Sequence, residues 1–222
     1  MNWNALNLSL ELAFWTCVVL LPLAVIIARI LAWGRVRGKS FYEALIALPL
    51  VLPPTVLGYY LLVSLGGDSP IGRAYEALFG HGLVFTFDGL LLASIVFNLP
   101  FAVQPIQQAF QAVPTDVREA AWVSGMSHWR TFWQVELPLG WPGLVSALAL
   151  TFAHTLGEFG VVLMVGGSIP GQTKTVAIAI YDRVQAFDEG VAGTMSAVLL
   201  AFSFAAIGLV YLLANRHRLR IV

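Results

Sequence analysis

The sequence predicts an all-α integral membrane protein with about five transmembrane helices, and its composition and charge-free stretches carry that expectation. Of the 222 residues, 59% are hydrophobic and 11% are charged, whereas a soluble domain averages about 25% charged residues. The stretches 44–67 and 190–215 contain no charged residue. Each is longer than the roughly 20 apolar residues that cross a bilayer core. We expect one transmembrane domain over residues 1–222.

Five segments are long enough to cross the membrane. They are Leu8–Trp33, Tyr42–Leu65, Gly89–Phe110, Trp141–Gly166 and Ala192–Ala214. A sixth segment, Thr175–Phe187, is shorter and carries Asp182 and Arg183 in its middle. We expect it to form an interfacial helix or a helix extension, with a six-span arrangement as the alternative.

Lysine and arginine residues divide unequally between the two sides of a five-span chain. Nine fall on one side: Arg29, Arg35, Arg37, Lys39, Arg118, Arg130, Arg216, Arg218 and Arg220. Three fall on the other side: Arg73, Lys174 and Arg183. Because cytoplasmic loops carry the excess of basic residues, we expect the N-terminus outside and the C-terminus in the cytoplasm. No basic residue precedes the first apolar run, so we expect a retained span rather than a cleaved signal peptide.

A polar insert of about residues 112–140 separates the third and fourth segments. We expect it to fold as two short helices, the first capped by Thr115 and closed by Gly125 in the left-handed conformation. Ser127 is expected to cap the second helix, and Pro138 to begin its end. Taken by themselves, these residues are equally consistent with an amphipathic connector on the membrane surface.

The spacing within this insert resembles the EAA loop of the membrane subunits of bacterial ABC importers. That consensus is Glu-Ala-Ala, three residues, Gly, nine residues, an aliphatic residue, one residue, then Leu-Pro. The matching residues are Glu119, Ala120, Ala121, Gly125, Val135, Leu137 and Pro138. The resemblance implies a type I ABC-importer permease architecture, in which Glu119 to Gly125 docks into a groove of a separate ATP-binding subunit. Rigid-body motion of that subunit is then transmitted to the membrane helices.

No ATP site is expected within the chain itself. The stretch "GRVRGKS" (Gly34–Ser40) has three residues between its glycines, whereas a phosphate-binding loop has four. The four histidines, at positions 81, 128, 154 and 217, have no ligand-like spacing. We therefore expect no catalytic residue, no metal site and no cofactor, and a transport subunit rather than an enzyme. The zero net charge gives no indication of nucleic-acid binding.

Two further stretches extend the resemblance over nearly the whole chain. Leu48–Gly66 and His154–Asp182 are similar to the molybdate-transport permeases of the ModB type. The likeness implies molybdate import across a bacterial inner membrane, with tungstate or sulfate and thiosulfate as alternatives. It also implies a homodimer with two ATPase subunits, and a separate extracytoplasmic oxyanion-binding protein. The loops Gly66–Thr86 and Gly167–Val191 are the expected docking surfaces for that protein.

Polar groups and prolines within the spans suggest a pathway or gate. The candidate residues are Pro53, Pro54, Thr55, Gln104, His154 and Glu158. Glutamines at 104, 107, 108 and 111 form either a water-lined exit or interhelical hydrogen bonds. For Glu158 we favour a structural role, in which it caps a break at "LGEFG" with His154 as its partner. An ATPase-independent channel or ion-driven carrier is the alternative class, but it leaves the EAA pattern unexplained.

Overall fold

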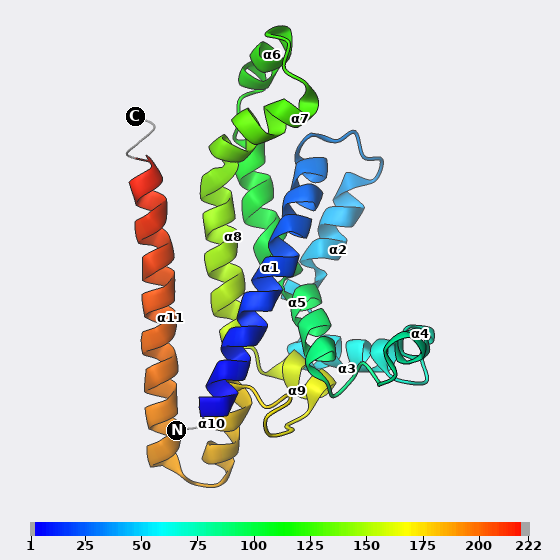
Figure 1. Ribbon diagram of the computed structural model, residues 1–222, viewed down its shortest axis with the longest axis vertical. Helices are drawn as coiled ribbons and strands as arrows, with labels where there is room; N and C mark the ends of the chain where they lie inside the picture. The colour runs from blue at the N-terminus through cyan, green and yellow to red at the C-terminus, as the bar shows by residue number, and fades with distance from the viewer. Residues whose placement is uncertain (1–2, 219–222) are drawn as a thin grey trace.

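The computed structural model describes the backbone of residues 3–218, and the side chains of that range except those of residues 209 and 213–218. Four long helices run along the long axis (Figure 1). They are α1 (Trp3–Trp33), α5 (Phe87–Gln111), α8 (Leu137–Gly157) and α11 (Glu189–Arg218). Within the described residues every regular element is helical, which confirms the all-α expectation. Arg220 of the basic C-terminus lies outside the described residues.

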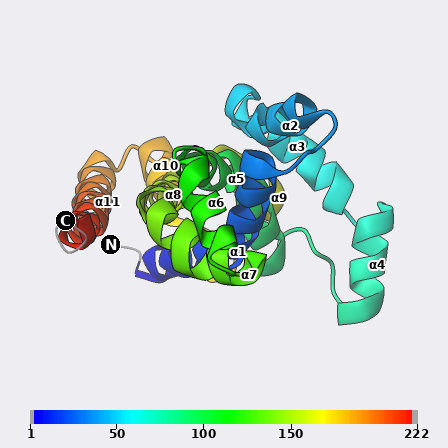
Figure 2. The same ribbon diagram turned by 90° about the horizontal axis from the view of Figure 1, so that it is seen from above.

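Helices α1, α5 and α8 form the centre of the bundle, and α11 stands at its flank beside α8 (Figure 2). The central core contains Leu20, Ala28, Val103, Ile106 and Phe110. Glycines on α8 bring it close to α5, as small residues commonly do between membrane helices. A Cβ added at Gly143 would lie 2.4 Å from the Cβ of Ala109, and one at Gly140 would lie 2.6 Å from the ring of Phe110.

The second predicted span is broken rather than straight. It consists of α2 (Lys39–Val51) and α3 (Pro54–Leu65), which meet at an angle of 112°. Leu52 and Pro53 between them have extended backbones, with ψ of 137° and 136°. Two consecutive prolines remove two helical donors, and each disfavours helical geometry in the residue before it. Pro100 and Pro105, in contrast, lie inside an unbroken α5.

The fourth predicted span begins earlier and ends earlier than expected. The short helix α7 (His128–Thr131) continues through the π-helical segment η1 (Phe132–Glu136) into α8, so the predicted end at Pro138 is wrong. The wider π turn ends two residues before Pro138, where it accommodates a proline ring that would clash with the preceding turn of a regular helix. Helix α8 stops at Gly157 instead of reaching Gly166, and the separate short helix α9 (Gly160–Gly166) follows.

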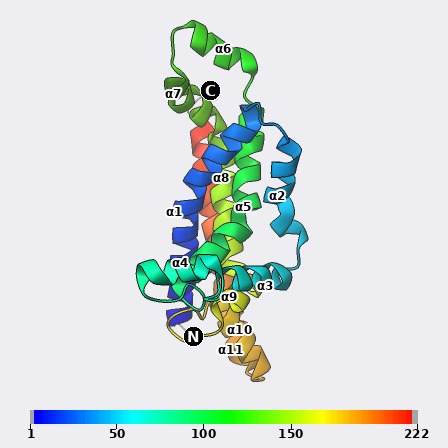
Figure 3. The same ribbon diagram turned by 90° about the vertical axis from the view of Figure 1, so that its right-hand side faces the viewer.

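Four helices of the described chain are long and apolar enough to cross a membrane, or five if the bent pair counts as one span. The predicted five spans correspond to the second count. The sixth segment forms α10 (Val176–Gln185), a separate helix of ten residues. It lies with α3, α9 and α4 (Pro70–Phe79) at one end of the bundle (Figure 3). Helix α6 (Thr115–Val123), α7 and the α1–α2 loop lie at the opposite end.

Candidate functional site

Helix α6 lies above the end of the bundle and is held there by short connections (Figure 1). Pro114 occupies its N-cap position with φ −59° and ψ 138°, and no side chain caps the helix. The prediction that Thr115 caps α6 is therefore wrong, because Thr115 is already the first helical residue. Asp116 lies in the first turn, where a carboxylate suits the positive end of the helix dipole.

Gly125 closes α6 in the left-handed conformation, with φ of 84°, which confirms that prediction. The N–H of Gly125 donates to the carbonyl of Trp122 at 2.9 Å, and the N–H of Met126 donates to that of Ala121 at 3.0 Å. These two bonds form the Schellman arrangement that satisfies the last carbonyls of a helix. No atom lies within 4 Å of a Cβ placed on Gly125, so this turn presents bare backbone to its surroundings.

The seven residues of the EAA pattern fall into two groups. Glu119, Ala120 and Gly125 are exposed on α6 and its C-terminal turn, and Ala121 is buried beneath them. Val135, Leu137 and Pro138 lie at the junction of η1 and α8, where Leu137 packs against the central core. The first group offers a surface at the tip of the molecule. The second group fixes how the chain re-enters the bundle.

A buried carboxylate beneath α6 was not predicted from the sequence. Glu136, in η1, has no solvent exposure. Its Oε2 accepts a hydrogen bond from Nε of Arg29 at 2.7 Å, and its Oε1 accepts one from Nε of Arg118 at 3.0 Å. The guanidinium of Arg118 also lies over the ring of Trp33, 3.8 Å from its centroid. A charged residue inside the EAA spacing was the available signal, but its partners lie 107 and 18 residues away.

The glutamines of α5 line a cavity of about 400 Å³ against α2, toward the same end as α6. Its lining residues are Glu43, Ala44, Ile46, Ala47, Gln104, Gln107, Gln108 and Gln111. Nε2 of Gln107 donates to Oε1 of Glu43 at 2.6 Å. The interhelical hydrogen bond is thus present, and the cavity beside it leaves the water-lined exit as a prediction.

Glu158 caps a helix break, as the favoured interpretation predicted. Its Oε1 accepts a hydrogen bond from the N–H of Val161 at 3.0 Å, at the start of α9. His154 is directed elsewhere: its Nδ1 lies 3.1 Å from Oδ1 of Asn98, and its ring stacks near Phe101. The expected partnership of His154 with Glu158 is wrong, because α8 ends at Gly157 and the two side chains no longer share a helix face.

The two helix breaks lie against each other. A Cβ on Gly160 would lie 2.7 Å from Cβ of Pro54, and α3 packs along α9. Pro53, Pro54 and Thr55 are exposed in the single chain. The structure thus brings this proline turn close to the break at Glu158, whereas Gln104 lies apart from both in the α2–α5 cavity.

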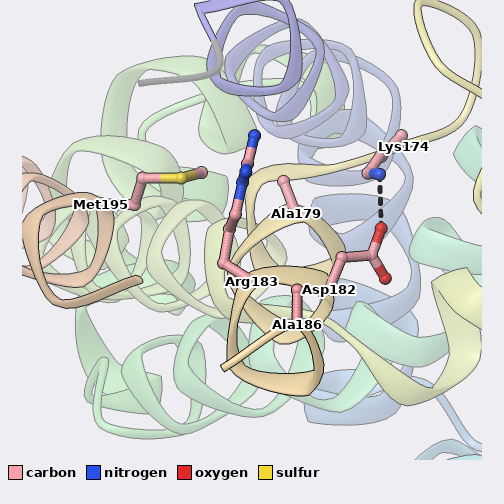
Figure 4. A pocket seen from close by; sticks show the side chains of 6 residues that line it. All are labelled: Lys174, Ala179, Asp182, Arg183, Ala186 and Met195. Atoms are coloured by element: carbon pink, nitrogen blue, oxygen red, sulfur yellow. Dashed lines mark ion pairs between the residues drawn. The ribbon is translucent and has the colours of Figure 1, made fainter. Parts of the chain in front are cut away.

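The end of the bundle opposite α6 carries surface polar groups and a small pocket of about 220 Å³. Figure 4 shows its lining residues, Lys174, Ala179, Asp182, Arg183, Ala186 and Met195, and the ion pair between Lys174 and Asp182. On α4, at the same end of the bundle but away from this pocket, Oη of Tyr75 donates to Oδ2 of Asp88 at 2.5 Å. That hydrogen bond raises the pKa of Tyr75 to about 12, because ionisation would remove the proton that Tyr75 donates, and the negative charge of Asp88 adds to the shift.

The fold is that of the membrane subunits of ABC importers. One similar chain belongs to the bacterial ABC transporter involved in the import of the polysaccharide alginate, with a TM-score of 0.78 at 13% identity over 96% of this chain and 78% of that one. Another belongs to the inward-facing methionine ABC transporter MetNI, with a TM-score of 0.71 at 17% identity over 97% of this chain and 93% of that one.

Helices that cross the membrane and an EAA loop between them define a multi-pass membrane subunit of a transport system. Residues 21–219 match the family described as the inner membrane component of binding-protein-dependent transport systems, and the chain belongs to that family. It is accordingly a transport subunit and not an enzyme.

Relatives within the family have specific names. The chain is 47% identical to the molybdenum transport system permease protein ModB of Azotobacter vinelandii, over 93% of this chain and 92% of that protein. It is 39% identical to ModB of Haemophilus influenzae, over 83% and 81%. A "Probable sulfate transport system permease protein cysT" of Chlorella vulgaris is 34% identical over 89% of this chain and 74% of that protein.

Proposed function

We propose that the chain is the permease subunit of an ATP-driven importer and forms, as a homodimer, the translocation path for molybdate. The support is the 47% identity to ModB over nearly the full length of both proteins, against 34% to the sulfate relative over a smaller share of that protein. Tungstate is the closest alternative substrate, because it has nearly the same size and charge as molybdate. Sulfate or thiosulfate is the next.

The α6 end of the bundle faces the cytoplasm in this proposal, with the N-terminus outside and the C-terminus inside. Arg29, Arg35, Arg37, Arg118 and Arg130 all belong to elements at the α6 end. Among the residues that the structure describes, only Arg73, Lys174 and Arg183 are basic residues of the opposite end. An excess of basic residues on one side marks the cytoplasmic side of a membrane protein.

Two ATP-binding subunits dock on the two α6 helices of the dimer. Glu119, Ala120 and the bare backbone at Gly125 form the contact surface, and the small residues allow a partner to approach closely. Val123 on the same helix is 90% exposed, which suits a surface that another protein covers. The loops around α4 and α10 receive the extracytoplasmic oxyanion-binding protein at the other end.

The pathway runs past the proline turn and toward the glutamine-lined cavity. Pro53, Pro54 and Thr55 lie at the broken span, near the break that Glu158 caps. His154 and Gln104 provide polar groups without negative charge at two further levels of the bundle. Such groups bind an anion weakly enough to release it, as a conducting path requires, and tight recognition belongs to the binding protein.

Uptake into proteoliposomes tests the proposal. Vesicles containing this chain, its ATPase subunit and purified binding protein should accumulate molybdate only with ATP, with sulfate transported more slowly. Gly125→Trp should abolish uptake because the indole blocks docking. The matched control is Gly38→Trp, since Gly38 also has a positive φ, of 73°, and open space at its Cβ. ATP-independent uptake would favour the channel or carrier class, and wild-type uptake by Gly125→Trp would overturn the docking surface.

A further inference from the structure

The buried carboxylate of Glu136 joins three elements that are otherwise distant in sequence. Arg29 belongs to the last turns of α1, Arg118 belongs to α6, and Glu136 itself lies where η1 passes into α8. Each carboxylate oxygen serves a different arginine: Oε2 serves Arg29 and Oε1 serves Arg118. A carboxylate used in this way is a two-ended connector, because losing either oxygen as an acceptor releases one element.

Arg118, the partner of Glu136 on α6, lies directly beside the exposed surface of that helix. Arg118 precedes Glu119, whose side chain is exposed. The side chain of Arg118 is only 12% exposed, and its guanidinium lies between the rings of Trp33 and Trp122, at 3.8 Å and 5.0 Å from their centroids. This stacking restricts the guanidinium. A displacement of α6 therefore moves the guanidinium of Arg118, which is held by the carboxylate of Glu136 and by the two tryptophan rings.

Arg29, the other partner of Glu136, belongs to α1, one of the helices at the centre of the bundle. Arg29 lies four residues before Trp33, the last residue of α1, and its guanidinium is 5.2 Å from the centroid of Phe132 in η1. Helices α1 and α8 pack on each other and on α5. The connector thus ends on the helices that form the core of the membrane domain.

Glu136 also ends a π-helical segment, and such segments occur frequently at functional sites. A buried ion pair is weak evidence for stability by itself, since desolvation offsets much of the attraction, but it fixes geometry where it is fully paired. Here the geometry that it fixes is the position of α6 relative to α1 and α8.

We propose that Glu136 is a positioning residue that transmits displacement of α6 to α1 and α8, with Arg118 and Arg29 as its two arms. This role rests on the proposed docking of an ATPase subunit on α6. It differs from docking because the connector is buried beneath the docking surface, so the partner can bind whether or not the connector is intact.

Glu136→Gln tests the connector with little change in volume. The amide keeps one acceptor oxygen and places an NH₂ group toward the other guanidinium, so one arm is lost. In proteoliposomes with ATPase and binding protein, we expect the ATPase subunit to remain bound and to hydrolyse ATP. The ratio of molybdate taken up to ATP hydrolysed should fall about tenfold, within the usual range of coupling between sites. Glu136→Asp, which keeps both oxygens, should stay closer to the wild-type ratio.

A double variant distinguishes a connector from a local support. If Arg118 and Glu136 act in series, Arg118→Gln/Glu136→Gln should have the same ratio as either single variant, whereas independent contributions would multiply. Lys39→Gln is the matched control at the same end, because it removes a partly exposed pair with Glu43 at 3.7 Å. It should leave the ratio unchanged. If Glu136→Gln does not fold, Arg118→Gln alone carries the comparison.

The outcomes separate this proposal from the proposed function. A wild-type ratio in Glu136→Gln, with Gly125→Trp inactive, overturns the connector and leaves the docking surface intact. Loss of the ATPase subunit from Glu136→Gln also overturns it, since the residue would then only shape α6. If Gly125→Trp transports normally, the docking surface is overturned, and if wild-type uptake does not require ATP, the proposed function itself fails.

Discussion

The two ends of the bundle use ion pairs in different ways. At the α6 end, one fully buried carboxylate, Glu136, binds two arginines from separate elements. At the opposite end, Lys174 pairs with Asp182, and Arg183 with Asp188, among side chains that are 20% to 53% exposed. Water reaches both partners in each pair of the second group, whereas in the first group it reaches Arg29, which is 35% exposed, but not the carboxylate of Glu136. The comparison indicates that the contacts of Glu136 hold one geometry at the α6 end, whereas the partly exposed pairs tolerate local rearrangement.

The largest effect that tests this contrast is expected from Glu136→Ala. Removing the carboxylate leaves Arg118 in a confined site without its acceptor, and breaking a buried pair in this way costs about 3 kcal/mol. Thermal unfolding of the purified chain in detergent should show a clear decrease in midpoint. A midpoint equal to that of the wild type would mean that the two ends do not differ in the way described.

A medium effect is expected at two residues, one at each end of the bundle, that close short helices in the left-handed conformation. Gly125 closes α6 with φ of 84°, and Phe187 follows α10 with φ of 56°. Gly125→Ala should destabilise the α6 turn by about 1 kcal/mol, because the left-handed conformation is unfavourable for a residue with a Cβ.

Phe187→Gly is the opposite change at the other end, because it removes a Cβ from a left-handed residue. It should slow amide hydrogen exchange in the α10 turn. Amide hydrogen exchange at the two turns measures both changes. Faster exchange at α10 in Phe187→Gly would contradict the strain assigned to Phe187.

The smallest effect is expected from Asp182→Asn. The ion pair with Lys174 is partly exposed, and such pairs contribute about 0–1 kcal/mol. The unfolding midpoint should change little, and raising the salt concentration should reduce even that difference. A loss as large as that of Glu136→Ala would show that the outer pair is as important as the buried one.

The sequence predicted the unbroken helices well. The third and fifth predicted spans lie within α5 and α11, because long apolar stretches without paired prolines specify a membrane helix by themselves. The left-handed turn at Gly125 was also predictable, since a glycine after a run of helix formers closes a helix locally.

The breaks and the buried connector were harder to predict, because they depend on packing between distant parts of the chain. Hydropathy does not distinguish Pro53–Pro54, which bend the chain by 112°, from Pro100 and Pro105, which leave α5 continuous. The partners of Glu136 and His154 lie on other helices, at separations of 107 and 56 residues for Arg29 and Asn98. No local pattern encodes such pairs. The sequence therefore located the polar loop that contains α6 but not the buried contacts beneath it.

The double proline between α2 and α3 has a consequence for how deeply water enters the membrane domain. In an unbroken helix, the carbonyls of Pro49 and Leu50 would accept hydrogen bonds from the N–H groups of residues 53 and 54, and both of those residues are prolines. Lipid cannot supply the missing donors. The end of α2 at this bend must therefore face water or another protein surface, so the double proline keeps this level of the chain away from lipid.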